Sequence, residues 1–269
     1  MCYDILIVGG GPAGLSAAIN GRVRGKTVLL LSSPMEDSPL WKAERVENYL
    51  GLPGVTGAEL LTAFHRHAEA SGAELRELRA LSAMPVGDRW YLSGEDQVFE
   101  GRALILAAGA VRGKPLPGEE RLLGRGVSYC ATCDGMLYRG RNVVVLGWTG
   151  SAEREADFLR GIGCAVRYYD RPQGVEILGE EAVTGVRVNG REEAADAVFL
   201  LRPAVAPAAL LPGLAMENGS VTVDRQMATN LPGVFAAGDC TGAPYQVAKA
   251  VGEGLIAGQS AAKWADRQG

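Results

Sequence analysis

A glycine-rich turn near the amino end restricts the fold of this chain more than any other feature. The G-x-G-x-x-G pattern of residues 9–14 follows a branched apolar segment at residues 4–8 and precedes an alanine-rich segment at residues 15–24. A second apolar segment covers residues 27–31. The apolar segments indicate buried strands, and the alanine-rich segment indicates a helix. This order is typical of a Rossmann-type unit, in which the glycines allow a pyrophosphate to approach the start of the helix.

A second unit of the same type begins in the middle of the chain. Residues 142–146 form another apolar segment, and the turn at residues 147–152 follows it directly. Residues 153–161 then predict a helix, and residues 165–169 predict a strand. Two well-separated starts of this kind predict two nucleotide-type domains.

Linker-like composition marks the boundaries between the two domains. A proline- and glycine-rich stretch occurs at residues 113–118, and residues 202–207 contain the prolines Pro203 and Pro207. The final helix pattern has no strand after it, so we expect the tail to return to the first domain. The sequence therefore predicts an α/β fold of two Rossmann-like domains, with the second inserted into the first and shortened. The first domain comprises residues 1–112 and 204–269, and the inserted domain comprises residues 113–203.

The charge balance and apolar runs exclude several classes of function. The 27 basic and 31 acidic residues leave a formal net charge of −4, which argues against nucleic acid or an anionic membrane as the main partner. Runs such as residues 103–110 are far shorter than the roughly 20 apolar residues of a membrane helix. Asp4 interrupts the first apolar segment, so no signal peptide is expected. We expect a soluble, cytoplasmic protein.

A close pair of cysteines is the strongest chemical signal. Cys130 and Cys133 form a C-x-x-C motif, and Asp134 follows directly. Such a pair suits reversible disulfide chemistry, because the two thiols can close a small ring and their surroundings can lower a thiol pKa. Zinc would need further ligands, and the two histidines, His65 and His67, lie in a distant predicted helix. We therefore predict a redox site with no metal, and we expect the other three cysteines to be structural.

Taken together, these segments resemble the low-molecular-weight thioredoxin reductase family of flavoproteins over nearly the whole chain. The resemblance implies an oxidoreductase that is a homodimer, with FAD bound by the first domain and the redox-active disulfide carried by the inserted one. The motifs that carry it are Gly9–Gly14, Val46–Gly51, Ala107–Ala110, Ser128–Gly135 and Gly233–Asp239.

The same resemblance implies roles for individual residues. Cys133 would face the flavin, Cys130 would exchange with thioredoxin, and Asp134 would act as the acid and base for the dithiol. At the end of the second strand, Ser32 and Ser33 replace the usual acidic residue, and their hydroxyls can bond the ribose more weakly. The turn motif and the resemblance together predict these cofactor-binding residues: Gly9, Gly11, Pro12, Ala13, Gly14, Ser32, Ser33, Leu40, Lys42, Asn48, Ala108, Gly109, Gly238, Asp239, Gln246, Val247 and Ala248.

The inserted domain departs from the pattern of the NADPH-dependent members. They carry a G-x-G-x-x-A turn and a basic H-R-R-x-x-x-R run, whereas this chain has Trp148 and Thr149 within its turn at residues 147–152. After the next predicted strand, Asp170 would repel a 2′-phosphate. The stretch before residue 197 is also too short for the usual remaining strands. These departures predict that the protein does not use NADPH.

The departures resemble the ferredoxin-dependent flavin thioredoxin reductases, the pyridine-nucleotide-independent branch of the family. The tail segments at residues 227–233 and 244–250 resemble that branch as well. The resemblance implies electron flow from ferredoxin through FAD and the Cys130–Cys133 dithiol to thioredoxin. A diflavin-linked disulfide oxidoreductase, an NADPH-dependent thioredoxin reductase with an atypical site, and a non-enzymatic flavin redox sensor remain alternatives. An acidic ferredoxin would need a basic docking face, for which the candidates are Arg121, Arg125, Arg139 and Arg141.

Overall fold

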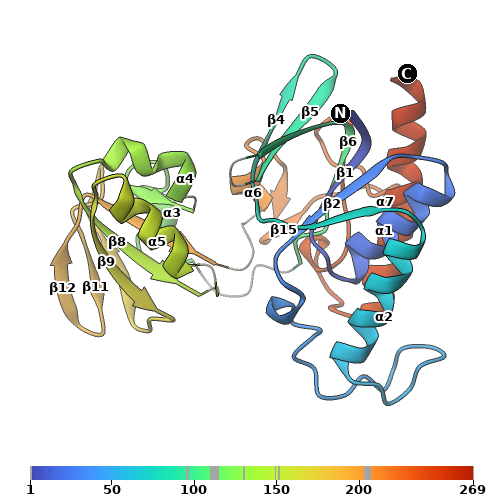
Figure 1. The fold of residues 1–269 in the computed structure, drawn as a ribbon, viewed down its shortest axis with the longest axis horizontal. Helices are drawn as coiled ribbons and strands as arrows, with labels where there is room; N and C mark the ends of the chain where they lie inside the picture. Colours follow the sequence, from blue (N-terminus) through green and yellow to red (C-terminus); the bar gives the residue numbers. More distant parts are fainter. Residues whose placement is uncertain are drawn as a thin grey trace. The chain divides into compact units, whose positions relative to one another are not determined.

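The computed structural model describes residues 2–94, 97–109, 115–129, 131–148, 150, 152–202 and 207–268, except for the side chains of Thr132 and Cys133. The chain divides into two compact units (Figure 1). Unit 1 comprises Met1–Val111 and Ala204–Gly269, and unit 2 comprises Arg112–Pro203. Both units combine helices with β-sheets, so the α/β class predicted from the sequence is confirmed.

Unit 1 is built on a seven-stranded sheet with the order β3-β2-β1-β6-β5-β4, in which β16 also pairs with β6. Strands β1, β2, β3, β6 and β16 are parallel, and β4 and β5 are antiparallel. The bounds are β1 (Cys2–Val8), β2 (Val28–Ser32), β3 (Glu74–Glu77), β4 (Ala80–Val86), β5 (Arg89–Gly94), β6 (Gln97–Leu106) and β16 (Val234–Ala236).

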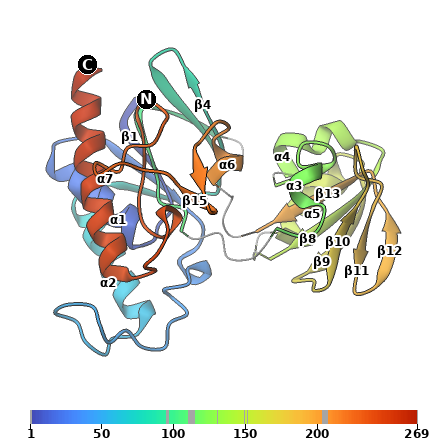
Figure 2. The ribbon, with the colours of Figure 1, turned by 180° about the vertical axis from the view of Figure 1, so that it is seen from behind.

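The apolar central strands are buried on both faces, as their sequences predicted. Along β1, Ile5 and Ile7 point to one core and Leu6 to the other, and all three are fully buried. Helices α1 (Pro12–Val23), α2 (Gly57–Ala70) and α7 (Val247–Arg267) pack on the Ile5 side (Figure 2). A Cβ atom at Gly254 would lie 2.1 Å from the carbonyl oxygen of Ala13, so glycine lets α7 lie directly against α1. The remaining elements are η1 (Met35–Asp37), α6 (Pro207–Leu210), β14 (Met216–Glu217), β15 (Ser220–Val221) and η3 (Asp239–Thr241).

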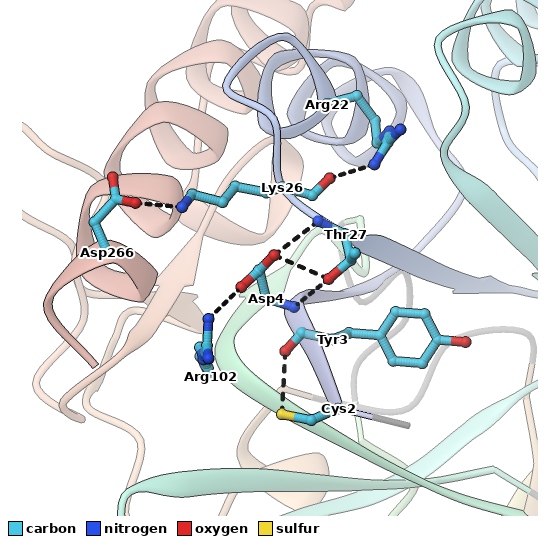
Figure 3. Close-up of polar contacts among 8 residues, drawn as sticks. All are labelled: Cys2, Tyr3, Asp4, Arg22, Lys26, Thr27, Arg102 and Asp266. Atoms are coloured by element: carbon cyan, nitrogen blue, oxygen red, sulfur yellow. Dashed lines mark hydrogen bonds and ion pairs between the residues drawn. The ribbon is translucent and has the colours of Figure 1, made fainter. Parts of the chain in front are cut away.

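A set of polar contacts joins the amino ends of the central strands (Figure 3). The carboxylate of Asp4 accepts hydrogen bonds from the backbone nitrogen of Thr27 at 2.8 Å, its hydroxyl at 2.9 Å and Nη1 of Arg102 at 2.7 Å. Lys26 forms an ion pair with Asp266 near the end of α7. These contacts link β1, β6, the residues before β2 and α7 at the edge of the sheet opposite the glycine-rich turn.

Unit 2 contains a parallel four-stranded sheet with the order β7-β13-β8-β9. Its bounds are β7 (Val127–Ser128), β13 (Ala197–Leu201), β8 (Asn142–Gly147) and β9 (Ala165–Asp170). Helix α5 (Ala152–Gly161) connects β8 to β9 and covers one face with Ala156 and Leu159. The antiparallel strands β10 (Val175–Leu178), β11 (Gly185–Val188) and β12 (Arg191–Ala194) pack on the other face. Short helices are α3 (Glu119–Leu122), α4 (Ala131–Asp134) and η2 (Gly135–Tyr138).

The strands β10–β12 correct one expectation from the sequence. The stretch between β9 and β13 was expected to be too short for the usual remaining strands, yet it forms this complete three-stranded sheet. The reason is the tight turn between β11 and β12, where Asn189 and Gly190 both adopt positive φ angles of 52° and 79°. An Asn-Gly pair with two positive φ angles closes a two-residue hairpin, which needs almost no additional chain. Within the described residues, no helix has the length and apolar character needed to cross a membrane.

Candidate active site

The glycine-rich turn at residues 9–14 connects β1 to α1. A Cβ atom at Gly9 would lie 2.2 Å from the carbonyl oxygen of Ala107, and one at Gly14 would lie 1.9 Å from that of Gly9, so both positions require glycine. At Gly11, the residue directly before α1, a Cβ atom would meet no other atom within 4 Å. The first turn of α1 contains no acidic residue, and no side chain caps it. The helix therefore offers its positive end and free backbone amides to open space, which suits a diphosphate.

The other predicted cofactor residues of unit 1 lie at the carboxyl ends of neighbouring parallel strands. Ser32 ends β2 and Ser33 follows it, and a Cβ atom at Gly10 would lie 2.7 Å from Cβ of Ser32. Ala108 and Gly109 follow β6, and Gly238 and Asp239 follow β16. Because β1, β2, β6 and β16 run parallel, these residues meet at the sheet edge that carries the glycine-rich turn.

A pocket of about 170 Å³ opens at this edge within unit 1. Gly109 and Asp239, two of the predicted cofactor residues, line it together with Tyr245 and Cys240. The thiol of Cys240 is buried, and burial raises its pKa to about 12. It is therefore protonated and unreactive at neutral pH, as expected of a structural cysteine.

One contact joins two distant segments that the sequence analysis had assigned to the cofactor. Nδ2 of Asn48 donates a hydrogen bond to Oε1 of Gln246 at 2.8 Å, although 198 positions separate the two residues. Gln246 caps the start of α7, and Val247 and Ala248 form its first turn. Leu40 is half-buried, whereas the exposed Lys42 donates to the carbonyl oxygen of Asp37 at 3.4 Å, within its own loop. The structure thus brings Asn48 to α7 but leaves Lys42 directed toward residue 37.

The turn from Gly238 to Gly242 carries an ionic network that the sequence analysis missed. Nζ of Lys249 donates to the carbonyl oxygens of Gly238 and Gly242 at 2.7 and 2.8 Å, and to the hydroxyl of Thr241 at 2.8 Å. It also lies 3.1 Å from Oε2 of Glu253. That same oxygen accepts hydrogen bonds from the backbone nitrogen of Gly238 and from Thr241, each at 2.8 Å. The only sequence signal is a Lys and a Glu four residues apart at the start of the last helix.

In unit 2, a polar contact of Asp134 is described close in sequence to the predicted dithiol. Cys130 is outside the described residues, and Cys133 lies in α4, where its side chain is not described. Asp134 is half-buried, and the hydroxyl of Ser128 donates to its Oδ2 at 2.7 Å. The neighbouring Tyr138 has a raised pKa because of burial and the charge of Asp134. This hydrogen bond holds the carboxylate of Asp134, the last residue of the helix that contains Cys133.

A second polar cluster missed by the sequence analysis surrounds Glu119 in unit 2. Glu119 is only 3% exposed, and its carboxylate accepts hydrogen bonds from both terminal nitrogens of Arg202 at 2.9 Å. It also accepts from the hydroxyl of Tyr129 at 2.9 Å, and burial, followed by the Glu119 charge, raises the pKa of that hydroxyl. The Arg202 guanidinium lies over the ring of Trp148, 5.3 Å from its centroid. Glu119 and Tyr129 are ten positions apart, whereas Arg202 lies 83 positions after Glu119.

The cluster occupies the carboxyl ends of two adjacent strands. Trp148 follows β8 and Arg202 follows β13, and the backbone nitrogen of Trp148 donates to the carbonyl oxygen of Leu201 at 2.8 Å. This sheet edge is where a Rossmann-type unit binds its dinucleotide. Thr149, which the sequence analysis also singled out, lies outside the described residues.

Comparisons with known proteins agree with this architecture. The family model described as pyridine nucleotide-disulphide oxidoreductase matches residues 3–181 and 171–254. A thioredoxin reductase of Listeria innocua is 31% identical over 300 residues, covering 98% of this chain and 94% of the relative. A ferredoxin-flavin thioredoxin reductase from Clostridium acetobutylicum is 39% identical, covers 100% of this chain and 99% of its own, and has a TM-score of 0.89. A thioredoxin reductase from Gloeobacter violaceus is 30% identical, covers 99% of this chain and 95% of its own, and has a TM-score of 0.83.

Proposed function

The chain belongs to the pyridine nucleotide-disulphide oxidoreductase family, and from this premise we propose that it reduces thioredoxin with electrons from reduced ferredoxin. It is a flavin disulfide oxidoreductase of the thioredoxin reductase type, with FAD as its cofactor. The electron donor, the homodimeric state and the cytoplasmic location are parts of this proposal. The ferredoxin donor has support from the 39% identity to the clostridial ferredoxin-flavin thioredoxin reductase.

Unit 1 offers the features that an FAD molecule needs. The amides at the start of α1 would hold the diphosphate, Ser32 would reach the ribose, and Asp239 would meet the ribityl chain. Gln246, held by Asn48, would lie against the flavin ring. When bound, FAD supplies the ability to take up electrons singly and deliver them in pairs, which suits a one-electron donor and a two-electron acceptor.

The residues of unit 2 would carry out the thiol chemistry. The Cys130 thiolate would attack one sulfur of the thioredoxin disulfide and form a mixed disulfide. Cys133 would then attack Cys130, which closes the Cys130–Cys133 disulfide and releases thioredoxin with both sulfurs reduced. Asp134, oriented by Ser128, would deliver and remove the protons of these steps.

The observation that carries the choice of donor is the cluster of Glu119, Arg202 and Trp148. Arg202 lies over Trp148, the residue that follows β8, and both of its terminal nitrogens are engaged by Glu119. The Trp148 ring packs against the same guanidinium at the sheet edge where a coenzyme would bind. At the end of β9, Asp170 is exposed and adds a negative charge where a 2′-phosphate would lie. This edge favours a donor other than NADPH.

The proposed direction of electron flow is downhill. Low-potential ferredoxins lie near roughly −400 mV, and a thioredoxin disulfide lies near about −270 mV. The difference of about 130 mV corresponds to about 6 kcal/mol for two electrons.

Two of the four predicted basic docking residues are engaged within unit 2. Arg121 donates to the carbonyl oxygens of Gly179 and Glu180, and Arg141 lies 3.6 Å from Asp196. Arg125 and Arg139 are exposed. We therefore propose Arg125 and Arg139 as the residues that would meet an acidic ferredoxin.

Anaerobic rapid mixing tests the donor. We expect reduced ferredoxin to bleach the flavin absorbance faster than NADPH or NADH by a factor of roughly ten or more. Rapid bleaching by NADPH without bleaching by ferredoxin would refute the proposal. One flavin per chain, measured by extraction, would exclude the diflavin alternative.

The same assay tests the thiol roles. Cys130→Ser should abolish thioredoxin reduction, because Cys133 alone cannot attack the thioredoxin disulfide and then form a disulfide with a second thiol of its own pair. Flavin reduction by ferredoxin should remain intact. Cys2→Ser is the matched control, since Cys2 is an exposed thiol at the start of β1. Continued turnover by Cys130→Ser would contradict the assignment.

A further inference from the structure

We propose that Lys249 and Glu253 are positioning residues for FAD, which hold the turn from Gly238 to Gly242 against the first turn of α1. The inference rests on the proposed contact of Asp239 with the cofactor. It is independent of the electron donor, because it concerns only the shape of the flavin site in unit 1.

The contacts of Lys249 account for all of its hydrogen-bonding capacity. Its three N–H groups have three neutral oxygen partners between Gly238 and Gly242, at 2.7 to 2.8 Å, and its charge is balanced by Glu253 at 3.1 Å. Glu253 in turn accepts from the backbone nitrogen of Gly238. The pair thus engages both the N–H and the carbonyl of Gly238, the residue directly before Asp239. The side chains of Lys249 and Glu253 are only 15% and 19% exposed, so these contacts are shielded from water.

Stabilisation of α7 alone does not explain the pair. Lys249 is the third residue of α7, where the helix dipole disfavours a positive charge. A Lys placed four residues before a Glu is also the less favourable order for a helical ion pair. The partners of Lys249 outside α7 all belong to the turn from Gly238 to Gly242. The turn, and not the helix, therefore benefits from the pair.

The turn from Gly238 to Gly242 cannot adopt another conformation without losing its packing against α1. Gly238 adopts φ 87° and ψ −150°, a conformation that is open essentially to glycine alone. A Cβ atom at Gly238 would lie 2.8 Å from Cβ of Ala13, so the turn packs directly on the start of α1. Gly254, next to Glu253, makes the equivalent close approach to the carbonyl oxygen of Ala13. The pair thus fixes Asp239 relative to the diphosphate-binding end of α1 before the cofactor arrives, which lowers the entropic cost of binding.

Titration of the apoprotein with FAD tests this inference. Lys249→Met keeps much of the side-chain volume and removes all three donors, and we expect it to weaken FAD binding by about tenfold or more, or about 1.4 kcal/mol. Lys26→Met is the matched control, because Lys26 also pairs with an acidic residue of α7 in unit 1 but lies away from the turn. The control should bind FAD within about twofold of the parent protein, a difference well under 1.4 kcal/mol.

The thermal midpoint of each apoprotein separates positioning from general stabilisation. Weaker FAD binding in Lys249→Met alone, with an altered visible circular dichroism band of the bound flavin, supports the inference. An unchanged FAD affinity overturns it, even if the apoprotein midpoint falls, because the pair would then only stabilise the fold. An equal loss of affinity in both variants overturns it as well. If Lys249→Met does not fold, Glu253→Gln is compared with Asp266→Asn by the same criteria. None of these measurements includes ferredoxin or thioredoxin, so a failure here leaves the proposed donor untouched.

Discussion

Asp4 shows how one side chain can join several elements of unit 1 (Figure 3). Burial by itself raises the pKa of its carboxyl group, but the hydrogen bonds from Thr27 and the charge of Arg102 outweigh this effect and lower the pKa below its ordinary value. A lowered pKa in the folded state means that the charged form binds its partners more strongly than it binds water. The resulting stability is present above the pKa of the unfolded chain and is lost as the pH falls through the pKa of the folded protein.

Asp4→Asn should therefore destabilise unit 1 in a pH-dependent way. Removing the charge leaves Arg102 without its ionic partner, so we expect a loss of about 1–3 kcal/mol near neutral pH. The difference from the parent protein should shrink at acid pH, as the pH falls through the lowered pKa of the Asp4 carboxyl group in the folded parent. Urea unfolding at both pH values measures this, with Asp88→Asn as the control because Asp88 is exposed and lies 3.6 Å from Arg89. A loss of stability that is equal at both pH values would contradict the assignment.

At the scale of elements, the contact between α1 and α7 determines where the flavin site lies. Small residues line it, and the closest approaches are made by Gly254 to Ala13 and by Gly258, where a Cβ atom would lie 2.6 Å from the carbonyl oxygen of Ala17. Because α1 begins at the glycine-rich turn and α7 begins directly after Gln246, this contact fixes the two helix starts relative to each other.

Gly254→Ala should push the two helices apart. The added methyl group would overlap the Ala13 backbone, which cannot move without displacing the start of α1, so we expect a loss of about 1–3 kcal/mol in stability. Gly252 is the matched control in the same helix, since a Cβ atom there would meet no atom within 4 Å. Gly252→Ala should be neutral or stabilising by up to about 1 kcal/mol. Urea unfolding of the two variant apoproteins measures their free energies of unfolding. Equal values would contradict the predicted overlap of the added methyl group with the Ala13 backbone.

At the scale of the whole molecule, each unit has hydrophobic cores of its own. The two clusters on the faces of the seven-stranded sheet contain unit 1 residues, and the two clusters around the parallel four-stranded sheet contain unit 2 residues. A unit with a separate core can unfold as a separate cooperative step. A ligand that binds only one folded unit then stabilises that unit alone.

FAD should therefore raise the unfolding midpoint of unit 1 and leave that of unit 2 unchanged. Of the four tryptophans in the chain, only Trp148 lies in unit 2, so the fluorescence difference between the parent protein and Trp148→Phe reports on unit 2. Calorimetry with and without FAD should show one transition that moves with FAD concentration and one that does not. A single transition that moves as a whole would mean that the two units unfold together.

The features that depend on residues close together in the chain could be predicted from the sequence alone. The turn at residues 9–14, the buried strands on either side of it and the second strand–turn–helix unit follow from local patterns of glycine and apolar residues. The Asn189-Gly190 hairpin was equally readable, because the pair of positive φ angles is a property of two adjacent residues.

Only the tertiary structure decided which distant polar groups meet. The partners Glu119 and Arg202 are 83 positions apart, and Asn48 and Gln246 are 198 positions apart. Lys249 and Glu253 are close in sequence, but their hydrogen bonds hold the turn from Gly238 to Gly242, which lies outside their helix. Apolar periodicity specifies which face of an element is buried, whereas a hydrogen bond depends on atomic positions that exist only after the elements have packed.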